Sequence, residues 1–249
     1  MPPIVTLLTD FGVLDSYVAE MKGVLLSLAP RVELVDVTHE IPPGDVRAAQ
    51  YVLSRTWRRF PMSTVHLAVV DPGVGTARRA LAAEVDGQFF LAPDNGVLSS
   101  LPEATHFVSV ATPPSASATF HGRDVFAPAA AAIANGTALT HLGPTITDVV
   151  VSPLPQPRQV ADGIVGEVIY VDRFGTLVSN LPIDKVGPRS KVSVAGRDAG
   201  PLRRTFADVR PGELVVFVGS GGAIEIAVRD GNAARQLGVG VGAPVAMTR

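Results

Sequence analysis

Cysteine is absent from this 249-residue sequence. Disulfide bonds, thiolate catalysis and cysteine-ligated metal sites are therefore all excluded. Charged residues are scarce at 18% of the chain, whereas hydrophobic residues reach 47%, a balance that favours a compact globular protein over a disordered one. The net charge is only −2 and no basic run is present, so nucleic acid is not an expected partner.

Long apolar runs and targeting signals are absent as well. The sequence has no stretch of about 18 uninterrupted apolar residues, so no membrane span is expected. Residues 1–4 lead directly into a predicted strand, without the basic region and apolar core of a signal peptide. We therefore expect a cytoplasmic protein. No metal is predicted, because no metal-ligand spacing is found around His39, His66, His106 and His141.

Strand and helix patterns alternate over residues 1–150, which predicts an N-terminal α/β sandwich domain. The hairpin expected in this half turns at Asp86-Gly87, a strong turn signal. The predicted elements are strands at 4–8, 32–37, 65–70 and 108–110, a hairpin of 80–85 with 88–91, and helices that start near Asp15 and Asp45 or span 125–134.

The composition changes after about residue 150. Residues 151–162 begin with a proline-rich run and are predicted to be an interdomain linker. Residues 163–249 contain short predicted strands, glycine turns and a brief helix near 232–237, a pattern that predicts a smaller C-terminal β-barrel or sandwich. We interpret Gly238 to Gly242 as a hairpin turn, because no helix follows it as a dinucleotide-binding loop requires.

Polar residues follow predicted strand ends in the first half. Asp71 comes directly after a buried strand that Pro72-Gly73 cannot continue, and Arg78 can fold back to pair with it. The alternative interpretation is a capped turn beside a solvated arginine. Asp10, Asp94-Asn95 and His121 occupy similar places, and such residues together line one edge of an open α/β sheet, where ligands bind.

Two aromatic residues and a glycine-rich turn are the corresponding features of the second half. Phe174 interrupts a predicted strand two positions after Asp172, and Phe206 follows in a second break. Such rings either fill a barrel core or, where exposed, hold a purine. Ser220 lies in the turn 219–222, which either presents backbone N–H groups and a hydroxyl to a carboxylate or is an ordinary flexible turn.

Seven short motifs, in order over nearly the full length, resemble the S-adenosyl-L-methionine (SAM) hydroxide adenosyltransferases, a family related to fluorinases and chlorinases. They are Leu8–Gly12, Asp36–His39, Val70–Gly75, Ala92–Gly96, Phe120–Asp124, Val171–Gly175 and Gly231–Ala234. The resemblance implies an α/β/α sandwich followed by a smaller β-barrel. It also implies hydrolysis of SAM to adenosine and L-methionine without metal or cofactor, in a homotrimer whose active sites lie between subunits.

The same resemblance assigns site residues. Asp71, Arg78 and His121 surround the attacking water, whereas halogenating relatives carry tyrosine in place of Asp71 and His121. The implied substrate-binding residues are Asp10 for the ribose hydroxyls, Asp172 for the methionine ammonium, Ser220 for its carboxylate, Asp15 near the methionine end, and Phe174 and Phe206 for adenine. Thr176 stands where relatives usually have Asn, whose amide reads an adenine edge with both a donor and an acceptor, whereas Thr does only part of this. Gly44 stands where some halogenating relatives have Trp, which changes one wall of the pocket. Both departures bear on the selectivity for a purine.

The chemistry agrees with these residue types. A sulfonium is an excellent leaving group, so the remaining work is to hold water in line with C5′. A carboxylate paired with a guanidinium is a weak base, so we expect His121 to accept the water proton while Asp71 and Arg78 orient the water. The alternatives are a halide-dependent adenosyltransferase, disfavoured because a carboxylate repels halide, and a non-catalytic SAM or adenosine sensor.

Overall fold

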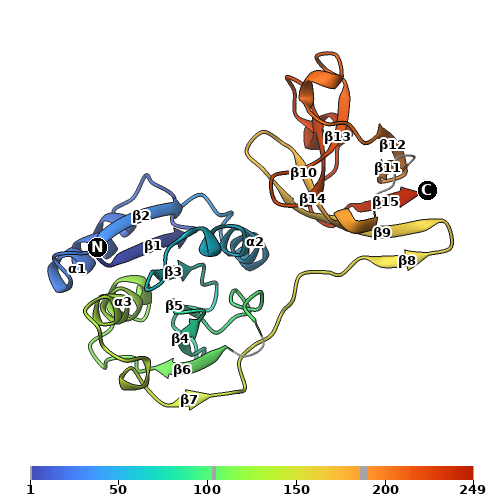
Figure 1. Ribbon diagram of the computed structural model, residues 1–249. Helices are drawn as coiled ribbons and strands as arrows, with labels where there is room; N and C mark the ends of the chain where they lie inside the picture. The colour runs from blue at the N-terminus through green and yellow to red at the C-terminus, as the bar shows by residue number, and fades with distance from the viewer. Residues whose placement is uncertain (1, 103–104, 186–189, 249) are drawn as a thin grey trace. The chain divides into compact units, whose positions relative to one another are not determined.

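The structure is a computed structural model that describes residues 2–102, 105–185 and 190–248. Its contacts divide the chain into an N-terminal unit, Met1–Pro153, and a C-terminal unit, Leu154–Arg249 (Figure 1). The predicted linker at 151–162 is not uniformly irregular, because Arg158–Val160 forms strand β8 and pairs with β9 of the C-terminal unit. Among the described residues, no helix has both the length and the apolar character needed to cross a bilayer.

The N-terminal unit is a mixed α/β sheet domain in the order β2-β1-β3-β5-β4-β6-β7. Strands β1, β2, β3 and β5 run parallel, and β4, β6 and β7 complete the sheet in antiparallel pairs. Its strands are β1 Ile4–Thr9, β2 Glu33–Thr38, β3 Val65–Val69, β4 Ala80–Val85, β5 Gln88–Pro93, β6 His106–Val110 and β7 Thr145–Ile146.

Helices cover both faces of this sheet (Figure 1). Helix α1 (Tyr17–Leu28) packs beside α3 (Ala127–Ala134) on one face, where Met21 and Leu25 join the main core. Helix α2 (Val46–Thr56) covers the other face and starts as predicted, because the Asp45 carboxylate accepts the Ala48 N–H at 2.9 Å. Shorter helical turns are η1 Trp57–Arg59, η2 Gly122–Phe126 and η3 Leu139–His141.

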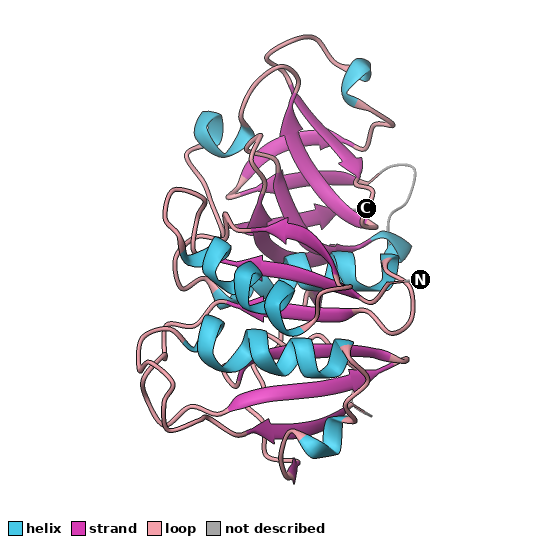
Figure 2. Cartoon of the chain, turned by 90° about the vertical axis from the view of Figure 1, so that its left-hand side faces the viewer, coloured by secondary structure: helices cyan, strands magenta, loops and turns pink. Residues whose placement is uncertain are grey.

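The C-terminal unit is a nearly closed antiparallel β-barrel, which Figure 2 shows as a group of strands with few helical turns. The order is β12-β11-β15-β9-β10-β14-β13, and a bridge between Leu202 and Val216 brings the two ends of the sheet together. Its elements are β8 Arg158–Val160, β9 Gly163–Val171, β10 Leu177–Pro182, η4 Ile183–Lys185, β11 Lys191–Val194, β12 Arg197–Pro201, η5 Phe206–Asp208, β13 Leu214–Val218, β14 Ala223–Val228, α4 Ala233–Leu237 and β15 Pro244–Thr248.

One predicted turn in the C-terminal unit is wrong. Gly238 adopts a left-handed conformation, with φ +65°, and ends α4. Residues 239–243 then lead to β15, which pairs with β9 and β11, so the glycine-rich segment connects a helix to a strand and does not form a hairpin. Gly238 caps the C-terminus of α4, a position where glycine is common because it adopts the left-handed conformation without strain.

Candidate active site

The loop between β3 and β4 carries Asp71 and Arg78 at its two ends. Asp71 Oδ1 accepts the Gly73 N–H at 3.2 Å, and the Thr76 hydroxyl donates to the Gly73 carbonyl at 2.7 Å, so the loop is compact. Gly75 has φ +79°, and a β-carbon there would lie 2.7 Å from the Ala118 carbonyl oxygen. Glycine at this position therefore lets the loop approach the segment that leads to His121.

The Arg78 guanidinium joins Asp71 and His121. Its Nε donates to both carboxylate oxygens of Asp71, at 3.0 and 2.8 Å, and its Nη2 donates to Oδ2 as well. The same Nη2 lies 2.8 Å from His121 Nδ1. Only 9% of the Arg78 side chain is exposed, and its Nη1 is buried with no hydrogen-bond partner in the described part of the chain. The structure therefore brings the three predicted catalytic residues together.

His121 begins a π-helical turn, η2, that runs directly into α3. The turn is braced by Arg123, which donates to both oxygens of Asp124 and to Glu20 on α1. His121 is 8% exposed, and burial together with the positive charge of Arg78 lowers the pKa of His121. The site therefore holds His121 as a neutral imidazole at neutral pH.

Asp10 reaches the same edge of the sheet at the end of β1. Its Oδ2 accepts the Gly44 N–H at 2.7 Å, and a β-carbon at Gly44 would touch Pro72, the residue after Asp71. Asp15 is exposed in the loop before α1, and the hydrogen bonds of the described residues do not tie it to this group. The structure thus links Asp10 to the Asp71 loop and leaves Asp15 as a prediction.

Next to Asp10 in the sequence, a polar chain that the sequence reasoning did not predict runs from the buried Thr9 and His39 to the exposed Asp36. The Thr9 hydroxyl lies 2.8 Å from His39 Nδ1, and His39 Nε2 lies 3.0 Å from Asp36, which also binds Lys22 at 2.6 Å. These contacts fix the end of β1 against the end of β2. The available signal was the order Asp36-x-x-His39 at the end of a strand adjacent to Thr9-Asp10.

The C-terminal unit has a cavity of about 830 Å³. All five site residues predicted in this half line it, namely Asp172, Phe174, Thr176, Phe206 and Ser220. The sequence reasoning missed Glu225, which also lines the cavity. Its signal was a lone carboxylate within the otherwise apolar strand β14.

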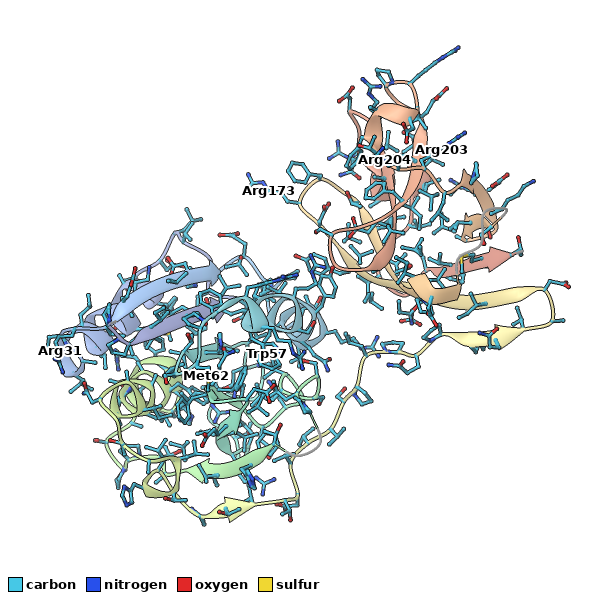
Figure 3. The ribbon with its side chains drawn as sticks, in the orientation of Figure 1. Arg31, Trp57, Met62, Arg173, Arg203 and Arg204 are labelled. Carbon is cyan, nitrogen blue, oxygen red and sulfur yellow. The ribbon has the colours of Figure 1, made fainter. Side chains whose placement is uncertain are left out.

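Asp172 shapes one wall of this cavity. Its Oδ1 accepts the N–H groups of Phe174 and Thr176, at 3.0 and 2.7 Å, which closes the turn between β9 and β10. Gly175 within the turn has φ +84°, and the Asn232 side chain occupies the space that a β-carbon would need. This turn presents the Phe174 ring, which is 77% exposed, while the neighbouring Arg173 extends outward from the unit (Figure 3).

Phe206 lies on a second turn at the cavity. The side chains of Thr205 and Asp208 cap this turn, η5, reciprocally. The Phe206 ring rests on Phe217, with centroids 4.7 Å apart, and remains 45% exposed. An exposed ring supported from behind offers a rigid apolar face to a flat ligand such as a purine.

These features define a two-part protein: an α/β domain with a buried guanidinium between a carboxylate and an imidazole, and a β-barrel domain with an aromatic, acidic cavity. Comparison with known proteins assigns the two units to the two domains of one family. Residues 5–143 match the SAM hydroxide adenosyltransferase N-terminal domain, and residues 166–246 match the C-terminal domain of the same family. The chain belongs to the SAM hydroxide adenosyltransferase family.

Relatives match over nearly the whole length. The (R)-S-adenosyl-L-methionine hydrolases of Salinispora tropica and Thermus thermophilus are each 42% identical, covering 95% and 96% of this chain and 94% and 96% of their own. A fluorinase from an Actinoplanes species is more distant, at 28% identity over 90% of both chains. The crystal structure of an uncharacterized conserved protein from Thermotoga maritima matches with a TM-score of 0.90 and 36% identity, over 99% of this chain and 100% of that one.

Proposed function

We propose that this chain hydrolyses (R)-S-adenosyl-L-methionine to adenosine and L-methionine, with Asp71, Arg78 and His121 as the catalytic residues. The near full-length relatives named (R)-S-adenosyl-L-methionine hydrolases support the reaction. The observation that carries the residue assignment is the Arg78 guanidinium, which is hydrogen-bonded to both Asp71 and His121. The reaction forms a bond from the water oxygen to C5′ and breaks the C5′–S bond, whose electron pair remains on the methionine sulfur, while the water proton that is hydrogen-bonded to Asp71 is released to solvent.

The hydrogen bond from Arg78 revises the role expected for His121. Arginine has donors and no acceptor, so His121 Nδ1 must be the acceptor of this bond. The neutral imidazole then carries its proton on Nε2 and donates from that atom. We therefore assign His121 as a donor that stabilises hydroxide character on the water oxygen, in place of the proton acceptor that the sequence suggested.

Asp71 and Arg78 complete this arrangement. The Asp71 carboxylate supplies the acceptor lone pairs of the group, and it orients a water by accepting one of its protons in a hydrogen bond. Arg78 Nη1 is a buried donor with no partner among the described residues, so it is available to the developing oxyanion. Donors that are fixed before the reaction stabilise charge that appears only in the transition state.

The remaining site residues keep their proposed roles in substrate binding. Phe174 and Phe206 hold adenine between exposed rings, and Asp172 pairs with the methionine ammonium through Oδ2, since Oδ1 is engaged in its turn. Asp10 accepts the ribose hydroxyls with a carboxylate oriented by Gly44. We further propose that Thr176 reads part of the adenine edge, that Ser220 binds the methionine carboxylate, and that Asp15 lies near the methionine end.

An isotope experiment tests the reaction. SAM is incubated with the protein in H₂¹⁸O containing chloride, and the products are separated and weighed by mass spectrometry. We expect adenosine with the label in its 5′-hydroxyl, together with unlabelled methionine. 5′-Chloro-5′-deoxyadenosine as the main product would instead identify a halide-dependent adenosyltransferase. Tight adenosine binding without any turnover would identify a sensor.

We also propose a homotrimer, located in the cytoplasm, whose active sites are shared between subunits. The proposed catalytic residues and the aromatic cavity occur in different units of the chain, which is compatible with a site completed by assembly. Mixing the inactive variants Asp71→Asn and Asp172→Ala is expected to restore activity through hybrid trimers, since some sites then contain no altered residue. Light scattering checks the trimer, and a mixture that remains inactive after proven subunit exchange contradicts shared sites.

A further inference from the structure

The strand order places β5 between the two ends of the catalytic loop. β3 and β5 are parallel, and β5 and β4 are antiparallel, so β3 and β5 end at the same edge at which β4 begins. The chain leaves β3 at Asp71 and must cross the end of β5 before it enters β4 at Ala80. The turn that follows β5, residues 94–96, therefore emerges between the two arms of this loop.

Asn95 holds the first arm. Its Nδ2 donates to the carbonyl of Val70, the residue directly before Asp71, at 2.8 Å. Its Oδ1 accepts the Val97 N–H at 3.2 Å. Only an amide supplies a donor and an acceptor on one planar group of this size, so the side chain fixes the Val70–Asp71 peptide relative to its own turn.

Asp94 holds the second arm. Its Oδ2 accepts the Arg79 Nε–H at 2.9 Å and lies 2.7 Å from Nη2, while its backbone N–H donates to the Arg79 carbonyl at 2.9 Å. Its Oδ1 accepts the Val150 N–H at 2.7 Å, and the side chain is only 4% exposed. Arg79 directly follows Arg78, so this carboxylate fixes the end of the loop from which the catalytic guanidinium projects.

We propose that Asp94 and Asn95 are positioning residues that set the distance between Asp71 and Arg78, and so the contact of Arg78 with His121. This inference rests on the proposed function of those three residues. The turn bonds both arms of the loop, at Val70 and at Arg79, and so fixes the separation of the residues that follow and precede them. Misplacement of reacting groups by about 1 Å can lower a rate by about 100-fold, so the expected effect falls on kcat.

Asn95→Asp is the sharpest test, because it keeps the shape and turns an oxygen toward the Val70 carbonyl. Asn135→Asp is the matched control, since Asn135 Nδ2 donates to the Leu28 carbonyl at 2.8 Å in the same unit. We expect Asn95→Asp to lower kcat by about 100-fold with KM unchanged, and the control to leave both unchanged. Asn95→Ala, which adds no charge, is expected to behave as Asn95→Asp does.

A titration separates positioning from stability and from the reaction itself. Arg78 lowers the pKa of His121, whereas Asp71 and Asp124 raise it, so moving Asp71 relative to Arg78 in Asn95→Ala is expected to shift that pKa, as followed by NMR of the imidazole. If both Asn95 variants keep the wild-type kcat or the wild-type His121 titration, positioning is overturned. If the wild-type protein does not hydrolyse SAM, the proposed function fails, and the shifted titration still supports the positioning role.

Discussion

Substituting Arg78 by lysine is expected to lower kcat for SAM hydrolysis by about 1,000-fold. One guanidinium donates through Nε and Nη2 to Asp71 and through Nη2 to His121. Lysine keeps the charge but has a single nitrogen, so it cannot bind both partners in this planar geometry and also leave a donor for the oxyanion. Steady-state kinetics with product separation measures the effect, and binding of adenosine is expected to remain.

Arg31→Lys is the control for this substitution. Arg31 is exposed and lies just before β2, at the edge of the sheet opposite the carboxyl ends of the parallel strands (Figure 3). The kcat of Arg31→Lys should equal that of the wild type, and Arg31→Lys and Arg78→Lys should both keep the wild-type circular dichroism spectrum. A lysine variant at position 78 with nearly full kcat would remove Arg78 from the catalytic group.

Acidification is expected to destabilise the N-terminal unit through His66. Burial lowers the pKa of His66 from 6.5 to about 4, while the unfolded chain protonates near 6.5. The folded state therefore binds fewer protons in this range, and stability decreases as pH falls from 6.5 to about 4. This difference of about 2.5 pH units corresponds to roughly 3 kcal/mol.

The surroundings of His66 explain why the neutral form is favoured. Its Nε2 donates to Gln88 Oε1 at 2.7 Å, which leaves Nδ1 to accept from the Thr6 hydroxyl at 2.9 Å, and the ring stacks on Phe90. These contacts join β1, β3 and β5, the strands that lead to Asp10, Asp71 and Asn95. Protonation of Nδ1 removes its acceptor and places a charge in this core.

Urea unfolding between pH 7 and 4.5, followed by Trp57 fluorescence, measures the effect. Trp57 is the single tryptophan of the sequence, lies inside the N-terminal unit and contacts Phe90 (Figure 3). In His66→Asn the free energy of unfolding is expected to depend less on pH than in the wild type, even if the variant is less stable at pH 7. The exposed His106 provides the control, because His106→Asn should retain the wild-type pH dependence. If the free energy of unfolding changes equally with pH in the wild type and both variants, His66 is not the group responsible.

Local turn chemistry predicts much of the N-terminal fold. Asp86 and Gly87 adopt the positive φ values, +50° and +69°, that a two-residue hairpin between β4 and β5 requires. Asp45 caps α2 as expected. Such features depend on a few neighbouring residues, so the sequence contains the relevant information. The glycines at 238–242 are the counterexample, because a helix cap and a hairpin use the same residue type.

Strand order is what the sequence does not provide. Nothing local to Gln88–Pro93 indicates that β5 inserts between β3 and β4, since this pairing joins segments far apart in the chain. The role of Asn95 depends on that insertion, so it could be predicted only as one member of a polar edge.

The π-helical turn after His121 sets the rotational phase between the imidazole and α3. In this turn the Ala127 N–H donates to the Gly122 carbonyl, five residues back, so the backbone holds one residue more than an α-helical turn. Each residue of an α-helix advances the side-chain direction by about 100°. An uninterrupted α-helix that kept Ala130 and Ile133 in the core would therefore aim His121 about 100° away from Arg78. The extra residue in the turn allows α3 to pack in the core while His121 faces Arg78.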